Sequence, residues 1–127
     1  MKEVGKIWMN GKFVPFKDAN VHVLTHALHY STAVFEGIRC YNTPNGSAIF
    51  RLTEHVDRLF NSAKLYGMKM RYTKKQITDA IIRTVKASGL KDCYIRPIAY
   101  YGYGTMGLTP TLNKVDEIGR ASCRERV

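Results

Sequence analysis

Two short apolar runs lie near the start of the chain, at residues 7–9 and 13–14. Between these runs stands Asn10-Gly11, a dipeptide that readily adopts the two positive φ angles of a tight hairpin turn. Further strand-like runs, at residues 34–39 and 48–52, flank a second turn sequence, TPNG. The pattern therefore predicts two β-hairpins in this part of the chain.

Apolar residues recur at helical spacing in two later segments. The first predicted helix covers residues 54–66, with Thr53 as its N-cap and Gly67 as a left-handed stop. The second predicted helix follows Thr73 and Gln76, which have the spacing of a capping box.

A strand rich in tyrosine and isoleucine is predicted at residues 93–102, where Pro97 favours an edge or irregular position. Hairpins followed by helices and a further strand predict an antiparallel α+β domain. The length and the 45% hydrophobic content suit one domain of this kind.

The last eleven residues, EIGRASCRERV at positions 117–127, show no helical or strand period and no turn sequence. This string resembles the translation of a common sequencing-adaptor oligonucleotide. We therefore expect a domain at residues 1–116, followed by a tail that is not native to it. Because the tail holds three arginines and two glutamates, its removal lowers the formal charge only from +10 to about +9.

The formal charge of +10 raises the possibility of a basic nucleic-acid-binding module. The basic residues are scattered, however, and the longest run is Lys74-Lys75, so we expect no nucleic-acid partner. No apolar run approaches the ~20 residues that cross a bilayer, and the start of the chain lacks a secretory signal. We expect a cytoplasmic protein without a membrane partner, and its three cysteines lack the paired spacings of zinc or disulfide frameworks.

The segment at residues 25–39, THALHYSTAVFEGIR, is the densest candidate for chemistry. His22, His26 and His29 have a spacing that would place three imidazoles on one helix face for a metal. No acidic ligand or fourth histidine accompanies them, and such histidines are more often hydrogen-bonded structural residues. We therefore expect no metal site.

The same segment closely resembles the signature of the branched-chain aminotransferases, which are fold-type IV pyridoxal-phosphate enzymes of the class IV aminotransferase family. The shared pattern is His-Ala-Leu-His-Tyr followed by Val-Phe-Glu-Gly-Ile-Arg. The resemblance extends from about Ile7 to Asp116 and includes EHVDRL at 54–59, YIRP at 94–97 and GTMGL at 104–108. Ser31 departs from the pattern, because glycine is common there, and this departure bears on substrate range.

The resemblance implies the small N-terminal domain of the class IV fold, an antiparallel sheet with flanking helices. It implies transamination between branched-chain L-amino acids (leucine, isoleucine, valine) and 2-oxoglutarate, with glutamate and 2-oxo acids as partners and pyridoxal 5'-phosphate as cofactor. The catalytic Schiff-base lysine would lie in a larger C-terminal domain that is absent here. We therefore expect no catalytic residue in this chain, little activity from it alone, and at least a homodimer when full length.

By the same resemblance, Arg58 binds the cofactor phosphate, a role that suits the fixed fork of a guanidinium. Spacing alone leaves open a surface ion pair between Arg58 and Glu54, which lies four residues earlier.

The resemblance also assigns a set of substrate-binding residues. Strand alternation independently places Tyr94 and Arg96 on one face, although a half-exposed tyrosine ladder with a solvated arginine remains possible. The loop that carries Leu108 would reach the active site of a neighbouring subunit, or would simply be a mobile glycine-rich loop. A non-catalytic interaction domain with this fold is a further alternative. The predicted substrate-binding residues are Tyr30, Phe35, Gly37, Tyr94, Arg96 and Leu108.

Overall fold

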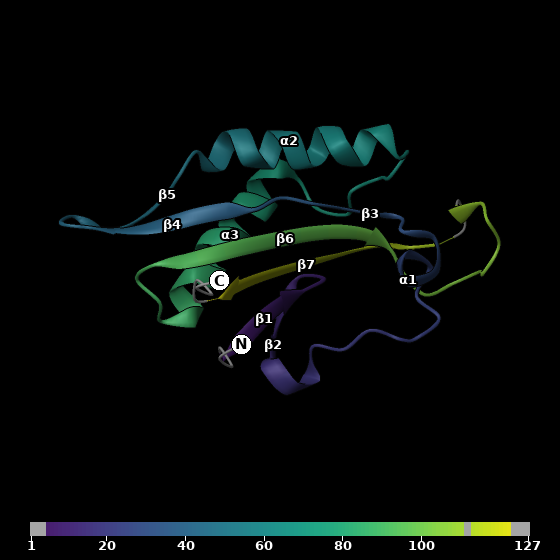
Figure 1. Ribbon diagram of the computed structural model, residues 1–127, viewed down its shortest axis with the longest axis horizontal. Helices are drawn as coiled ribbons and strands as arrows, with labels where there is room; N and C mark the ends of the chain where they lie inside the picture. Colours follow the sequence, from purple (N-terminus) through teal and green to yellow (C-terminus); the bar gives the residue numbers. More distant parts are fainter. Residues whose placement is uncertain (1–4, 111–112, 123–127) are drawn as a thin grey trace.

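A single antiparallel sheet organises the part of the chain that the computed structural model describes, residues 5–110 and 113–122. Its hydrogen-bonded order is β2-β1-β7-β6-β4-β5, and β3 also pairs with β6. Helices α2 and α3 lie together on one side of the sheet (Figure 1). The strands are β1 (Lys6–Met9), β2 (Lys12–Pro15), β3 (Ala33–Phe35), β4 (Ile38–Thr43), β5 (Gly46–Ile49), β6 (Cys93–Tyr101) and β7 (Val115–Ser122). The helices are η1 (Phe16–Asp18), α1 (His26–Tyr30), α2 (Leu52–Leu65) and α3 (Lys74–Ser88).

This architecture confirms the predicted α+β class and the first hairpin, whose turn has Asn10 at φ 48° and Gly11 at φ 90°. The second hairpin joins β4 to β5, so the predicted strand at 34–39 is wrong in extent: it is divided between β3 and β4. Among the described residues, no helix is long and apolar enough to cross a membrane.

Both main helices use their predicted apolar faces, but they begin differently. The capping box of α3 is confirmed, because Thr73 and Gln76 each bind the other's backbone amide, at 3.1 and 2.8 Å. Thr53 as the N-cap of α2 is wrong: the helix begins at Leu52, after Arg51 in the left-handed region. Thr53 therefore lies in the first helical turn.

One core fills the space between the two helices and the sheet. Leu59 of α2 and Ile81 of α3 are buried there against strand residues such as Ile38 and Ile95. Tyr94, Arg96 and Ile98 alternate with the core residues of β6, point to the opposite side of the sheet and are half-buried. We call this side the open face. The core therefore fixes the strands whose other side carries the predicted substrate residues.

Pro97 lies in the central strand β6, so of its two predicted positions the edge is wrong and the irregular position is confirmed. The physical reason is a local gap in the neighbouring ladder. β3 pairs with β6 up to Phe35, and β4 resumes the pairing at Ile38. The carbonyl of Pro97 accepts from the backbone of Glu36 in this gap, at 3.1 Å. An amide and a carbonyl of one strand residue point the same way, so the missing N–H of Pro97 falls where the ladder is interrupted.

Residues 117–122, in which the sequence showed no strand period, lie within β7, so that part of the prediction is wrong. Residues 123–127 lie outside the described residues, and a tail that is not native to the domain stays a prediction. β7 pairs with β6 along its whole length and with β1 at two positions. Strand alternation is present, with Val115 and Ala121 buried on the helix side. The sequence conceals it because two intervening positions on that side carry Glu117 and Gly119.

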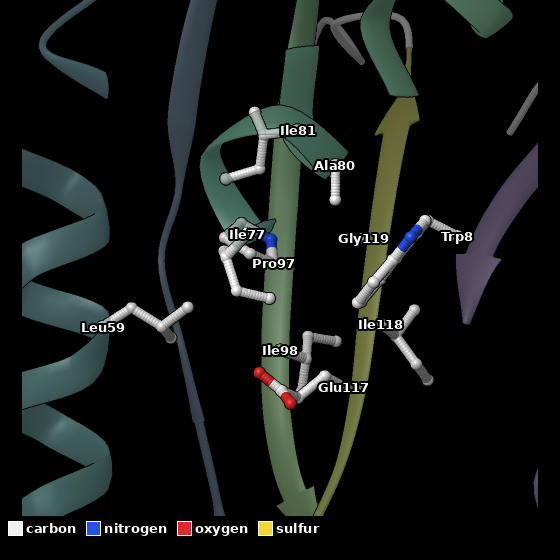
Figure 2. Close-up of a pocket in the computed structure, with 10 residues that line it drawn as sticks. All are labelled: Trp8, Leu59, Ile77, Ala80, Ile81, Pro97, Ile98, Glu117, Ile118 and Gly119. Atoms are coloured by element: carbon white, nitrogen blue, oxygen red, sulfur yellow. The ribbon is translucent and has the colours of Figure 1, made fainter. Parts of the chain in front are cut away.

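Glu117 borders a small cavity between the helices and the sheet (Figure 2). Its side chain is 2% exposed, and Oε2 accepts from the backbone amide of Arg71 at 3.1 Å. Oε1 is buried and has no partner among the described residues. Burial raises the pKa of this carboxyl from 4.5 to about 7, against smaller opposing effects of Arg71. Gly119 leaves space, since a Cβ there would lie 3.7 Å from the hydroxyl of Thr84.

Candidate active site

Four of the predicted substrate residues meet on the open face. Arg96 lies between two aromatic partners: Nη2 donates to the Tyr94 hydroxyl at 2.7 Å, and the guanidinium carbon lies 4.2 Å from the centre of the Phe35 ring. The Phe35 side chain is 57% exposed. A cation stacked on an aromatic face and tied by a hydrogen bond has little rotational freedom left. This group therefore holds a charge in place beside an apolar wall.

Gly37 belongs to this group because its lack of a side chain leaves room for the Tyr94 hydroxyl. A Cβ at Gly37 would overlap the hydroxyl of Tyr94. Any larger residue would push the phenol away from Arg96. Glycine is therefore needed here for close approach, and its φ angle is not the reason. We call Phe35, Gly37, Tyr94 and Arg96 the open-face cluster.

Sequence reasoning missed Arg39, which lies directly across from Tyr94 in the pairing of β4 with β6. Its guanidinium carbon is 5.5 Å from the centre of the Tyr41 ring. Nε of Arg39 and Nε of Arg96 are both buried and have no partner among the described residues. Counting by twos from Gly37 would have placed Arg39 on this face.

Arg58 joins a different group, on the helix side of the sheet. Its Nε lies 2.9 Å from both carboxylate oxygens of Glu36, and its Nη2 lies 2.7 Å from Oε1. His55 Nδ1 lies 2.7 Å from the same Oε1. The alternative of a surface pair with Glu54 is wrong, because Glu54 instead lies 3.8 Å from Arg51.

The charge state of Glu36 follows from these contacts. Burial alone would raise the pKa of its carboxyl, but hydrogen bonds from Arg58 and His55, and their charges, hold the pKa below 4.5. Glu36 is therefore ionised at neutral pH. The sequence contained a signal for it, since a glutamate at a core-facing position of an apolar strand needs a buried partner.

Tyr30 and Leu108 lie in a third group, formed by α1 and the loop at 102–108. The Tyr30 hydroxyl donates to the carbonyl of Met106 at 2.8 Å, and buried His26 Nε2 lies 2.8 Å from the carbonyl of Gly107. Leu108 itself is 80% exposed. Within the described ranges, no hydrogen bond or ring contact joins Tyr30 or Leu108 to the open-face cluster.

The loop is held at both ends and is therefore an ordered element of the site. The Asn113 amide donates to the carbonyls of Gly102 and Thr105, at 2.9 and 3.1 Å, and its oxygen accepts from Thr105. Sequence reasoning did not identify Asn113. An asparagine that satisfies several loop backbone groups has no sequence period, so the pattern gave no signal.

The three histidines considered as metal ligands have protein partners instead. Nδ1 of His22 accepts from the amide of Leu24, and His29 Nε2 lies 2.9 Å from the carbonyl of Val23. His26 uses both ring nitrogens, since its Nδ1 lies 2.8 Å from the Thr32 hydroxyl. In the described part of the chain, no group of three or more potential ligands lies close enough to hold a metal.

Comparison with known proteins gives a consistent result. Residues 33–118 match the family model "Amino-transferase class IV". The branched-chain-amino-acid aminotransferase of Pseudomonas aeruginosa is 47% identical over 114 residues, which are 90% of this chain and 37% of that protein. Two crystal structures of the T.th. branched-chain amino acid aminotransferase are each 45% identical with a TM-score of 0.94. They cover 98% and 99% of this chain, and this chain spans 42% and 43% of theirs.

One of these two structures is complexed with N-(5'-phosphopyridoxyl)-L-glutamate and the other with 4-methylvaleric acid. The chain spans about a third of the length of the curated relatives it matches. The family match covers more than half of the chain, including the open-face cluster, Glu36 and Arg58. The chain therefore belongs to the class IV aminotransferase family.

Proposed function

We propose that this chain is the small domain of a pyridoxal-phosphate-dependent branched-chain-amino-acid aminotransferase, and that its open face forms one wall of the substrate pocket. The observation that carries the proposal is Arg96, fixed between the Tyr94 hydroxyl and the Phe35 ring on the open face. A guanidinium held in this way is prepared to bind a carboxylate.

The dual substrate range explains why charge and apolar surface lie together. An enzyme that exchanges amino groups between leucine, isoleucine or valine and 2-oxoglutarate must accept an apolar side chain and a second carboxylate in one pocket. Phe35 suits the first and Arg96 the second. The ligands of the two similar crystal structures support this, since 4-methylvaleric acid has a branched apolar chain and the phosphopyridoxyl compound contains glutamate.

Arg58 is the residue that we propose for the cofactor phosphate. Its side chain is 66% exposed although it is anchored on Glu36, so its outer edge is open to a ligand. Glu36 takes Nε and Nη2, and Nη1 has no partner among the described residues. The donor set thus fits a phosphate group. When bound, pyridoxal phosphate would supply the carbonyl that accepts an amino group and the ring that withdraws electrons from the substrate.

Tyr30 and Leu108 would act away from the pocket of their own subunit. We propose that the loop at 102–108 presents Leu108, with Tyr30 beside it, to the active site of a neighbouring subunit in at least a dimer. The anchoring of the loop by His26 and Asn113 supports this role, because it would hold the exposed Leu108 side chain at a fixed position for a neighbouring subunit.

The lysine that binds the cofactor would be supplied by a C-terminal domain, so the chain alone would not catalyse transamination. The free thiols of Cys40 and Cys93, which lie opposite each other in β4 and β6, support a reducing compartment such as the cytoplasm.

The test begins with sequencing the source DNA beyond the codon for Asp116 and producing the complete enzyme. Leucine and 2-oxoglutarate are then assayed with Arg96→Leu and with Arg83→Leu as control, since Arg83 stacks on Phe13 far from the open-face cluster. We expect Arg96→Leu to raise KM for 2-oxoglutarate at least tenfold more than KM for leucine, a difference of about 1.4 kcal/mol. Equal effects on both substrates, or a gene without a second domain, would refute the proposal and favour a non-catalytic interaction domain.

A further inference from the structure

Glu36 occupies an unusual place for a carboxylate. It lies in the gap between β3 and β4, with Phe35 and Gly37 of the open-face cluster as its chain neighbours. The two neighbours face the open side, whereas Glu36 points toward the helices and is 5% exposed. Its backbone amide is fixed to the carbonyl of Pro97 in the central strand. The carboxylate therefore has little freedom to move relative to the sheet.

A buried carboxylate is costly unless other groups compensate its charge. Three side-chain nitrogens of α2 lie 2.7 to 2.9 Å from the Glu36 carboxylate. They are Nδ1 of His55 and Nε and Nη2 of Arg58. His55 and Arg58 are three residues apart on this helix, which places them on the same helical face. The contacts therefore join α2, which carries Arg58, to the gap between β3 and β4, where Glu36 lies between Phe35 and Gly37.

The geometry of the guanidinium decides what this pairing leaves available. Arginine has five N–H donors in one plane. Glu36 engages Nε–H and one hydrogen of Nη2, so the opposite edge keeps two hydrogens on Nη1 and one on Nη2. That remaining edge still matches two oxygens of a phosphate.

We infer that Glu36, braced by His55, is a positioning residue that orients the Arg58 guanidinium with its Nη1 edge outward for a phosphate group. This inference rests on the phosphate role proposed for Arg58 above. The new step is that an anionic side chain, Glu36, sets the orientation of Arg58. By its charge alone, Glu36 would weaken the attraction between Arg58 and a phosphate.

The charge of Glu36 and its positioning of Arg58 have opposite effects on phosphate affinity, so the inference can be tested. If Glu36 only compensates charge, its neutralisation will make an anion bind more tightly. If Glu36 positions Arg58, its loss will free a long side chain, and phosphate binding will then have to order it again. Glu36→Gln removes the charge and half of the paired acceptors. Glu36→Asp keeps the charge but shortens the reach by one methylene.

The experiment uses this chain labelled with ¹⁵N-arginine, with inorganic phosphate as the probe. The Arg58 Nε–H resonance is assigned by its loss in Arg58→Lys, and its order is measured from the heteronuclear NOE. Phosphate affinity is taken from titration shifts. Glu54→Gln is the matched control, because it removes the same charge from an exposed side chain of the same helix.

We expect a rigid Arg58 Nε–H in the unmodified chain and in Glu54→Gln, and a mobile one in both Glu36 variants. Phosphate should bind about 2- to 10-fold more weakly to the Glu36 variants, the range expected for re-ordering one long side chain. Backbone amide spectra report whether each variant is folded. If the Glu36 variants do not fold, His55→Gln keeps both arginine contacts and should give a smaller loss of Arg58 order.

An equally rigid Arg58 without Glu36, or without His55 where only that variant folds, would overturn the inference. So would tighter phosphate binding by Glu36→Gln with unchanged binding by Glu36→Asp. A different result separates the two proposals: if Glu36 orders Arg58 but phosphate binds equally well to Arg58→Lys, the phosphate role of Arg58 fails and the ordering remains as a structural contact only.

Discussion

The buried carboxyl of Glu117 should make the stability of this chain fall as pH rises. Burial raises its pKa from 4.5 to about 7. The folded state therefore holds a proton that the unfolded state releases, and stability is lost between these two pH values. Below pH 4.5 the group costs nothing, because it is protonated in both states. Above pH 7 the difference of about 2.5 pKa units corresponds to about 3 kcal/mol.

The assay is urea unfolding near pH 5 and near pH 8, followed by the fluorescence of Trp8, the single tryptophan, which is buried beside this cavity. Between these conditions the unmodified chain should lose about 2 to 3 kcal/mol more stability than Glu117→Gln, whose amide does not titrate. Contributions that the two chains share cancel in this difference. Glu36 acts in the opposite sense and below this window, because its pKa is lowered.

Glu54→Gln is the control, since it makes the same substitution at an exposed side chain. Glu117→Leu should lose the pH dependence in the same way as Glu117→Gln, because neither side chain titrates, but the leucine also leaves the Arg71 amide without its acceptor. Parallel pH profiles for the unmodified chain and Glu117→Gln would refute the reasoning, and would place Glu117 in contact with water.

Three further substitutions test local contacts. Gly37→Ala should displace the Tyr94 phenol and destabilise the chain by about 1 kcal/mol, seen as lost ring contacts in NMR spectra and a lower urea midpoint; an unmoved ring would contradict the close packing. Thr73→Ala should cost about 1 kcal/mol through loss of the capping box, and an unchanged midpoint would argue against that cap. Tyr30→Phe should speed amide exchange in the loop at 102–108 by removing the bond to Met106, and equal exchange rates would argue against anchoring by that hydroxyl.

The elements that the sequence predicted well are those with local causes. The turn at Asn10 and Gly11 and the capping box at Thr73 each depend on residues close together in the chain. The alternation of Tyr94 and Arg96 likewise needs only the period of one strand. For Pro97 the sequence left an edge and an irregular position open, because the break between β3 and β4 that decides between them is not visible in any local pattern.

The partner of Arg58 shows the same limit at the site. Local spacing proposed Glu54, four residues away, whereas the structure pairs Arg58 with Glu36, 22 residues away. A helix surface pair is exposed and contributes only tenths of a kcal/mol. A buried carboxylate without a donor is much more costly, so Glu36 determines the pairing. Glu36 is the side chain that would lose most free energy without a partner, so it determines which residue Arg58 contacts. Only the tertiary structure shows that Glu36 is buried beside Arg58.

The core-facing residues of β7 bear on where the native sequence of this domain ends. Pairing with β6 and β1 uses backbone groups, so a sequence without proline can complete the sheet here whatever its side chains are. The side of β7 that faces the helices packs best with apolar side chains. Val115 and Ala121 provide them, whereas Glu117 is charged when ionised and Gly119 has no side chain. A central strand with a buried carboxylate and an unfilled position is locally inconsistent with its own fold. We therefore propose that the domain's own sequence ends near Asp116 and that the source DNA encodes apolar residues at 117 and 119. Recovery of glutamate and glycine there, in genomic DNA free of adaptors, would contradict this.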